Sequence, residues 1–138
     1  MLGGIKLLPA KEQLIQYLSN KMTNQDIAKI YDITFQKVIQ LIKKYKIDPN
    51  ELRKVNKYIV YEHWLNSEVV YVGSGVWYRC RRIYNRRNSV HRQLMQDGNI
   101  DYKIVGEFDK EAEARDFEVR LIKKYKQLGQ AKFNKQVN

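Results

Sequence analysis

Two hydrophobic periodicities divide the chain. In the first third, apolar residues recur every three or four positions, which is typical of amphipathic helices. From Tyr58 onward, runs of β-branched and aromatic residues indicate strands. The pattern therefore predicts an α+β protein with a helical domain over 1–48, a linker over 49–56 and a mixed domain over 57–138.

Three helices are expected in the helical domain. Pro9 would open the first, while Thr23 and Thr34 would cap the second and third, because these residue types suit helix N-termini. Asp26, three residues after Thr23, completes a capping-box-like pair. Apolar residues at helical spacing would form the buried faces: Leu14, Ile15, Leu18, Met22, Ile27, Ala28, Ile30, Tyr31, Val38, Leu41, Ile42 and Tyr45.

The second and third helices resemble a helix-turn-helix. Asp32-Ile33 suits a tight turn, and Ala28 is small enough to lie where the two helices approach. In such a motif the third helix enters the major groove by its N-terminal end, where glutamine can bond base edges and lysine can neutralise phosphate. Its exposed side would offer Phe35, Gln36, Lys37, Gln40, Lys43 and Lys44. A hairpin of helices that only pack together is the alternative.

A β-hairpin is predicted at the start of the mixed domain. Residues 58–61 and 69–72 are strand-forming, and Asn66-Ser67 supplies turn chemistry between them. Gly73 and Gly75 follow the second strand and would allow close approach of backbone to a ligand.

One further strand and two helices are expected before the C-terminus. Ser89 would cap a short helix, 102–108 would form a third strand, and Asp109 would cap a long helix over 110–128. The tail would return to the sheet at Phe133.

The charge of the chain favours a polyanionic partner. The net charge is +11, and residues 69–96 contain no acid. A solvated helix face is the plainer interpretation, but like charges without acids repel each other, so contact with nucleic acid is favoured. Six arginines of this segment interleave with aromatics: Arg79, Arg81, Arg82, Arg86, Arg87 and Arg92 with Trp77, Tyr78 and Tyr84.

Composition argues against several other classes. No apolar run reaches membrane-spanning length, and the first residues lack the pattern of a signal peptide. A single cysteine, Cys80, makes no intrachain disulfide and, with two histidines, no cysteine zinc cluster. An intracellular, cytoplasmic protein without a membrane partner is therefore expected.

Two tripeptides of the hairpin resemble the motifs of the GIY-YIG endonuclease family. Ile59-Val60-Tyr61 stands where the family has its first motif, with Ile59 in place of glycine, and Tyr71-Val72-Gly73 stands where it has its second. The resemblance covers roughly 57–138. It implies a three-stranded antiparallel sheet flanked by helices, and hydrolysis of phosphodiester bonds in double-stranded DNA.

The resemblance also implies roles for single residues. Glu118 would hold one divalent cation, Mg²⁺ or Mn²⁺, although from the residues alone it is an ordinary helix carboxylate. Tyr61 would position or deprotonate the attacking water, with a lowered pKa in the second case, and Tyr71 would assist. Asn134 would support the site by hydrogen bonding. The phosphate-stabilising arginine is expected at Arg79, then Arg81, then Arg82. DNA contacts are expected from Arg82, Arg86, Arg87, His91 and Arg92.

Three functions remain open from the sequence. The first is a metal-dependent DNA endonuclease of homing type, as in phages and mobile elements, or of restriction type. One active site cuts one strand, so double-strand cleavage would require a homodimer, two sequential events or a second subunit. The second is a non-cleaving DNA-binding regulator on a degenerate GIY-YIG scaffold. The third, an RNA-binding or ribosome-associated protein, fits the helix-turn-helix poorly.

Overall fold

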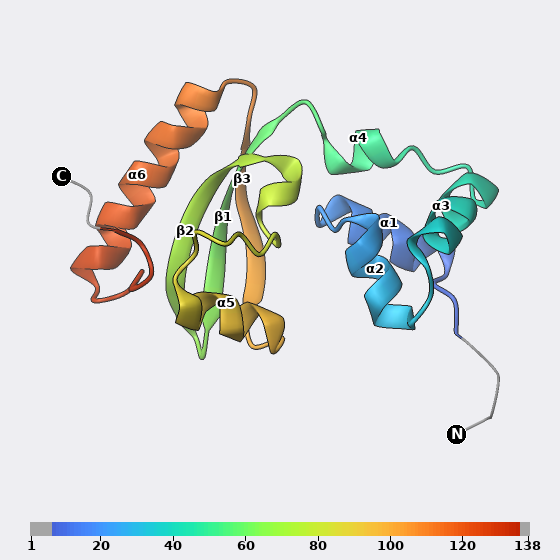
Figure 1. The fold of residues 1–138 in the computed structure, drawn as a ribbon. Coiled ribbons are helices and arrows are strands. Elements are labelled where there is room, and N and C mark those ends of the chain that lie inside the picture. The colour runs from blue at the N-terminus through green and yellow to red at the C-terminus, as the bar shows by residue number, and fades with distance from the viewer. Residues whose placement is uncertain (1–6, 136–138) are drawn as a thin grey trace. The chain divides into compact units, whose positions relative to one another are not determined.

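The described chain, residues 7–135 of a computed structural model, is an α+β protein made of two units (Figure 1). The boundary between the units falls between Lys54 and Val55. Each unit has its own hydrophobic core, and each is described by itself below. No helix among residues 7–135 is both long enough and apolar enough to cross a membrane.

The helical unit contains four helices. They are α1 (Lys11–Ser19), α2 (Asn24–Tyr31), α3 (Phe35–Lys44) and α4 (Pro49–Arg53). The predicted caps of α2 and α3 are confirmed, since the side chain of Thr23 accepts from Asp26 N–H and that of Thr34 accepts from Lys37 N–H. Pro9 does not open α1 as predicted. It is buried and precedes Ala10, the cap residue of that helix.

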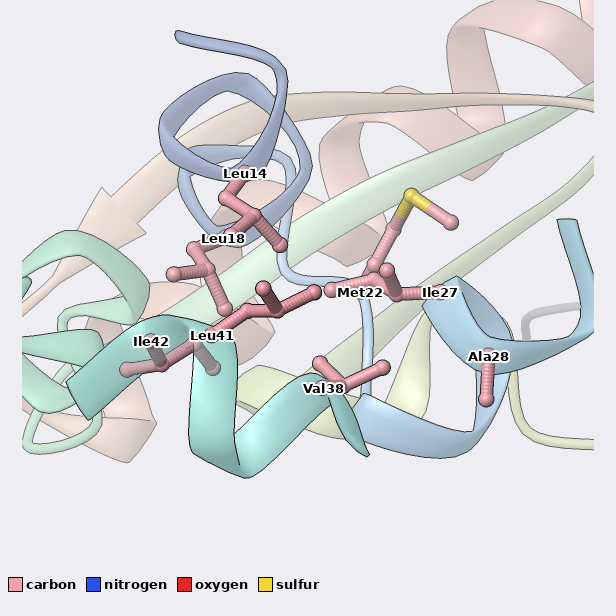
Figure 2. Close-up of a cluster of buried hydrophobic side chains, with 8 residues drawn as sticks. All are labelled: Leu14, Leu18, Met22, Ile27, Ala28, Val38, Leu41 and Ile42. Carbon is pink, nitrogen blue, oxygen red and sulfur yellow. The ribbon is translucent and has the colours of Figure 1, made fainter. Parts of the chain in front are cut away.

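Side chains from the first three helices and the turn after α1 form the core of this unit (Figure 2). All of them were among the apolar residues predicted for the buried faces, and each large aliphatic side chain contributes about 1.5–3 kcal/mol through its burial. Ala28 is buried, as its small size suggested. The core consists of Leu14, Leu18, Met22, Ile27, Ala28, Val38, Leu41 and Ile42.

The predicted linker over 49–56 is wrong over its first five residues, which form α4. Pro49 cannot continue α3, but it suits the first turn of a new helix, which Asp48 caps by accepting from two backbone N–H groups. The buried guanidinium of Arg53 donates twice to the carbonyl of Met22, over 3.1 and 2.9 Å, and to Asn24 Oδ1 over 2.7 Å. These bonds attach α4 to the helical unit.

The second unit is built on a three-stranded antiparallel sheet, as predicted, and the strand order is β2-β1-β3. A two-residue turn joins β1 and β2, and both of its residues, Asn66 (φ 51°) and Ser67 (φ 70°), are left-handed as a tight hairpin needs. The elements are β1 (Tyr58–Leu65), β2 (Glu68–Val76), the 3₁₀ turn η1 (Trp77–Arg79), α5 (Ser89–Gln96), β3 (Asp101–Phe108) and α6 (Glu111–Gln127).

The two faces of the sheet carry different elements (Figure 1). Val60 and other side chains at alternating positions pack against the apolar face of α6. Ile59 and Tyr61 point to the opposite face and pack with Cys80, which follows η1. The arginine-rich segment after β2 therefore lies on the face opposite α6.

The C-terminal tail returns to the sheet, as predicted at Phe133. Ala131 N–H donates to the carbonyl of Val69 over 2.7 Å, and Phe133 N–H donates to that of Val70 over 2.9 Å. The tail thereby pairs with part of the outer edge of β2, which would otherwise be open to another strand.

Two predicted caps in the sheet unit are wrong. Asn88, rather than Ser89, caps α5 by accepting from two backbone N–H groups. Asp109 does not cap α6, which begins after Lys110 without a side-chain bond. Asp109 instead pairs with Lys57, a contact that lowers the pKa of its carboxyl group.

Candidate functional site

Tyr61 and Tyr71 lie side by side on the face of the sheet opposite α6. Their ring centroids are 6.3 Å apart. Tyr61 is opposite Gly73 in the strand register, and its ring lies against that glycine so closely that a Cβ there would be 2.5 Å from its hydroxyl oxygen. Tyr61 is buried and Tyr71 is half-buried, so Tyr71 is the phenol with access to solvent.

We expect Gly73→Ala to displace the Tyr61 ring. The added methyl group overlaps a side chain that is itself buried, so neither partner can move away cheaply. The free energy of unfolding should fall by about 1–3 kcal/mol, measured by denaturant unfolding. Glu68→Ala at the exposed start of the same strand provides the control. A loss in Gly73→Ala no larger than the loss in Glu68→Ala would contradict the close approach.

Burial raises the pKa of Tyr61, and the neighbouring hydroxyl of Tyr71 raises it further. The guanidinium of Arg87 opposes this shift through its charge and through a long 3.5 Å hydrogen bond to the Tyr61 hydroxyl. The surrounding side chains thus shift the pKa of Tyr61 in the direction opposite to the one that general-base action requires. Tyr61 stays protonated at neutral pH and can act as a hydrogen-bond donor rather than as a general base.

Glu118 approaches the end of β2 from α6. Its Oε1 accepts a hydrogen bond from the hydroxyl of Ser74 over 3.2 Å, and the carboxylate is half-buried. Burial raises the pKa of Glu118, while the Ser74 hydroxyl and the guanidinium groups of Arg115 and Arg79 oppose that shift. The carboxylate is thus partly desolvated and lies within range of two guanidinium charges, a combination more common at functional sites than on helix surfaces.

Of the three arginines expected to stabilise phosphate, Arg79 is the one whose charge acts on the Glu118 carboxylate. Its aliphatic stem packs on Gly75, where a Cβ would be 2.6 Å from Arg79 Cδ. The guanidinium of Arg81 instead stacks 4.5 Å from the ring centroid of Tyr102, and its Nε is buried without a hydrogen-bond partner. Arg82 is exposed.

The site residues are therefore brought together in two groups on the same end of β2. Glu118 and Ser74 form one group, on the side of α6. Tyr61 and Tyr71 form the other, on the opposite face of the sheet, where the stem of Arg79 packs on Gly75. Among the described residues no hydrogen bond or ion pair joins the Glu118 carboxylate to Arg79 or to either phenol, so the structure does not show the expected direct convergence on the acid.

Asn134 holds the outer edge of β2 just before the site. Its Oδ1 accepts from Val72 N–H and its Nδ2 donates to the carbonyl of Val72, each over 2.8 Å. The carboxamide thus occupies both backbone groups of one residue, as a neighbouring strand would. It supports the strand that carries Gly73 and Ser74 rather than contacting the carboxylate.

His91 is not a surface phosphate contact, which corrects the prediction. It is buried on α5, with its Nε2 2.8 Å from Nδ1 of His63, a residue buried within β1. Nε2 of His63 is 2.6 Å from the carbonyl oxygen of Cys80, which can only accept. His63 therefore donates from Nε2, and His91 Nε2–H donates to His63 Nδ1, with both rings neutral.

The other predicted DNA contacts of the sheet unit differ in exposure. Arg86 is exposed, while Arg87 and Arg92 are half-buried. Nε of Arg92 is buried without a hydrogen-bond partner. Arg86 is accessible to a polyanion, whereas the guanidinium of Arg87 donates to the carbonyls of Arg82 and Arg79.

The predicted base- and phosphate-contacting side of α3 is accessible. Phe35, the first residue of the helix, is 40% exposed, which is unusual for a large aromatic side chain. Gln36 and Gln40 are exposed on successive turns. Lys43 and Lys44 are exposed at the C-terminal end, and Lys37 is half-buried.

Sequence reasoning missed a buried carboxylate that fixes α6. Glu62 on β1 accepts from the hydroxyl of Tyr125 over 2.6 Å and from Trp64 Nε1–H over 3.0 Å. Both donors are neutral and the carboxylate is buried, so the contact fixes the helix in register on the sheet. It thereby sets where Glu118, two turns earlier on α6, meets β2. The alternation of side chains along a strand could have indicated this contact, because it places Glu62 on the same face as Val60, the face that α6 covers.

Comparison with known proteins assigns no family: no family model, curated protein or solved structure matches the chain.

Proposed function

We propose that the protein is a divalent-metal-dependent DNA endonuclease of homing or restriction type, targeted by its helical unit. The observation that carries the proposal is the half-buried Glu118 carboxylate at the end of β2, which accepts from Ser74 and feels the charge of Arg79. A carboxylate and a guanidinium are the groups that hydrolysis of a phosphodiester needs for a cation and for phosphate charge. The resemblance of the β1 and β2 tripeptides to the GIY-YIG motifs supports the same chemistry.

The carboxylate of Glu118 is a suitable ligand for a hard cation such as Mg²⁺ or Mn²⁺. Within residues 7–135 no three His, Cys, Asp or Glu side chains gather into a protein-only metal cage. Mg²⁺ is commonly held by one or two carboxylates, with water and substrate phosphate oxygens completing the octahedron. Glu118 would be the protein ligand, and the Ser74 hydroxyl would orient it. The bound cation would supply charge stabilisation to the phosphate and its departing oxygen.

The remaining side chains act as orienting and charged groups in this proposal. Arg79 neutralises phosphate beside the carboxylate. Tyr71 is half-buried and offers its hydroxyl to an attacking water or to the phosphate. The protonated, buried Tyr61 lies next to Tyr71 and orients it. Asn134 keeps the edge strand in place. Ile59, at the position of the first motif's glycine, is buried with Cys80 and so occupies the core rather than the site.

The helical unit supplies the targeting step as a helix-turn-helix. Gln36 and Gln40 are suited to base edges, and Phe35 at the helix N-terminus is suited to a thymine methyl group. The lysines of α3 contribute phosphate attraction that does not depend on sequence. Binding should therefore fall steeply as salt is raised.

A plasmid assay tests both parts of the proposal. Purified protein should nick supercoiled DNA with Mg²⁺ or Mn²⁺ and not with excess EDTA. The double variant Gln36→Ala/Gln40→Ala should lose preference for particular sites, because each bidentate base contact provides about 1–3 kcal/mol of discrimination. It should keep metal-dependent nicking at unselected sites. Mapping of cleavage positions measures the preference, and Gln16→Ala on the exposed face of α1 is the control.

The alternative, a DNA-binding regulator that does not cleave, would replace the proposed endonuclease if no cleavage is observed. It predicts tight, salt-sensitive DNA binding with no nicking under any divalent cation. The same assay distinguishes nicking from double-strand cleavage, since a nick gives open circles and a double-strand cut gives linear plasmid.

A further inference from the structure

Tyr84 lies among three guanidinium groups in the segment between η1 and α5. The guanidinium carbons of Arg79, Arg82 and Arg87 are 5.3, 5.5 and 5.2 Å from the centroid of its ring. The guanidinium carbon of Arg82 is also 5.5 Å from the ring centroid of Tyr78, so this arginine contacts two rings. We refer to Tyr78, Arg82 and Tyr84 as the Arg82 platform.

Backbone turns and carbonyl bonds hold this segment in shape. Arg82 N–H donates to the carbonyl of Arg79 over 3.3 Å, and Arg87 N–H donates to the carbonyl of Tyr84 over 3.1 Å. The side chain of Arg87 donates to the carbonyls of Arg82 and Arg79. The Arg82 platform is therefore arranged before a ligand binds, which lowers the entropic cost of binding.

The surface around the Arg82 platform is positively charged and has no acid to balance it. Residues 69–96 contain no acid, and within the described part of the chain no ion pair joins a carboxylate to Arg79, Arg82 or Arg87. Three like charges around one ring repel each other, and an anion beside them relieves this repulsion. The ligand of this surface is therefore expected to carry several negative charges.

Flat and apolar side chains are accessible within the same charged surface. Ile83 is 40% exposed, Arg82 is exposed, and the rings of Tyr78 and Tyr84 are half-buried. Trp77 packs against Tyr78 edge to face, with ring centroids 5.4 Å apart. Contact with phosphate requires only the arginines. Aromatic rings and a planar guanidinium add faces on which nucleic-acid bases can stack.

The faces of DNA bases are accessible only where the strands are unpaired. In a duplex each base is stacked on its neighbours, and a protein meets phosphates and the edges of the bases in the grooves. A single strand presents flat bases and phosphates together, and proteins that bind single strands combine positive charge with stacking side chains. The combination of charge and flat faces at the Arg82 platform therefore fits an unpaired strand better than a duplex.

We propose that the Arg82 platform binds unpaired DNA, with a base stacked on the guanidinium of Arg82 and the phosphates of the same strand among the surrounding positive charges. The assignment rests on the proposed function and names its substrate class, which is duplex DNA with unpaired nucleotides next to the cleavage site. Arg82 then contacts a base, whereas the sequence predicted a phosphate contact for it.

Binding to single and double strands tests the proposal without any cleavage. Fluorescence anisotropy in EDTA gives the Kd for a labelled oligothymidylate and for a labelled, fully paired DNA with the same number of phosphates. Arg82→Lys keeps the charge but loses the planar face. It should weaken oligothymidylate binding by at least about fivefold, the lower end of what one base stack provides, with little change for the duplex. Arg120→Lys is the control, because Arg120 is an exposed arginine near a ring on α6.

Tyr84 variants test the ring that supports Arg82. Tyr84→Ala removes this ring and should weaken oligothymidylate binding by about five- to a hundredfold. Tyr84→Phe keeps the ring and should retain most of the binding. If Tyr84→Ala fails to fold, Arg82→Lys still gives the result, because the side chain of Arg82 is exposed.

Photo-crosslinking identifies the contacted residues directly. A DNA strand with 5-iodouracil at an unpaired position should cross-link to Tyr78 or Tyr84, the two rings that contact Arg82, as peptide mass spectrometry would show. The cross-link should be lost when the same base is paired in a duplex. Cross-links that form only in the helical unit would overturn the proposal.

The outcomes separate the Arg82 platform from the nuclease. Equal weakening of both DNAs by Arg82→Lys, or no weakening of either, would overturn the platform and leave the nuclease standing. A wild type that never nicks but binds oligothymidylate through Arg82 would overturn the nuclease and leave the platform. If both proposals hold, the wild type nicks a duplex with a short unpaired bulge faster than a fully paired one, and Arg82→Lys removes that difference.

Discussion

Glu118→Gln is expected to abolish metal-dependent nicking, with a fall in kcat of about a thousandfold or more, because the change removes the one carboxylate of the proposed cation site. The variant keeps the shape of the side chain and an oxygen that can accept from the Ser74 hydroxyl. Burial raises the pKa of Glu118, which means that the folded protein disfavours its charge at neutral pH. The glutamine variant should therefore be at least as stable as the wild type, and its DNA affinity should be equal or higher.

Three measurements on the same preparation check this expectation. They are nicking rate with Mg²⁺, DNA affinity without metal, and denaturant unfolding. Glu113→Gln is the control on the same helix, because Glu113 is exposed and the change removes the same charge. A Glu118→Gln variant that nicks at the rate of Glu113→Gln would exclude Glu118 from the chemistry. A variant that loses activity together with stability would show a structural carboxylate instead.

The features that sequence predicted well are set by neighbouring residues. Thr23 and Thr34 cap their helices through N–H groups three residues away, and Asn66-Ser67 turns the chain within two residues. The three-stranded antiparallel sheet was expected from the resemblance, and the hairpin follows from alternation and turn chemistry. Even among local features, competing caps were misjudged. Asn88 precedes Ser89 and has the same capping ability, so the choice depends on where the backbone bends.

The features that sequence did not predict depend on contacts between distant segments. Arg53 joins α4 to the turn before α2, 31 residues earlier in the chain, so a segment that reads as a polar linker belongs to the helical core. The register of β1 and β2 shifts between His63 and Trp64, which cannot be read from alternation. Arg87 differs from Arg86 because its side chain meets two carbonyls, and no composition rule separates the two.

The buried histidine pair was missed for the same reason, and it leads to the second large expected effect. Burial and the nearby charge of Arg87 lower the pKa of His63 to about 3 and that of His91 to about 4. Arg81 and the other ring of the pair also disfavour a proton on His63, while Tyr61, Tyr71 and Tyr102 surround it as neutral groups. Both histidines are thus held neutral in the folded protein near pH 5, where in an unfolded chain they would be charged.

The sign of the effect follows from proton binding. Between about pH 4 and pH 6.5 the unfolded chain binds more protons at these residues than the folded one, so stability rises with pH across this window. The stabilising contribution is complete above the unfolded pKa and is lost as pH falls toward the folded values. Because one pKa unit corresponds to about 1.4 kcal/mol, each histidine should remove about 2 kcal/mol at pH 5 relative to pH 7.

We therefore expect the free energy of unfolding of the sheet unit to fall by about 4 kcal/mol between pH 7 and pH 5. The chain has two tryptophans, Trp64 and Trp77, both in this unit, so fluorescence during urea unfolding measures it selectively. Carboxylates whose pKa is lowered in the folded protein also reduce the free energy of unfolding as they take up protons, but they do so mainly below about pH 5. Glu118, whose pKa is raised by burial, opposes it by gaining stability on protonation.

His91→Gln distinguishes the histidine pair from general acid sensitivity. The carboxamide of glutamine can still donate to Nδ1 of His63, so the core keeps its hydrogen bond while one titrating group is removed. The loss between pH 7 and pH 5 should then be about half that of the wild type. An unchanged pH dependence in His91→Gln would mean that other groups set the acid limit. A flat wild-type profile would mean that the pair takes up protons in the folded state, with the His63 contact to the Cys80 carbonyl preserved.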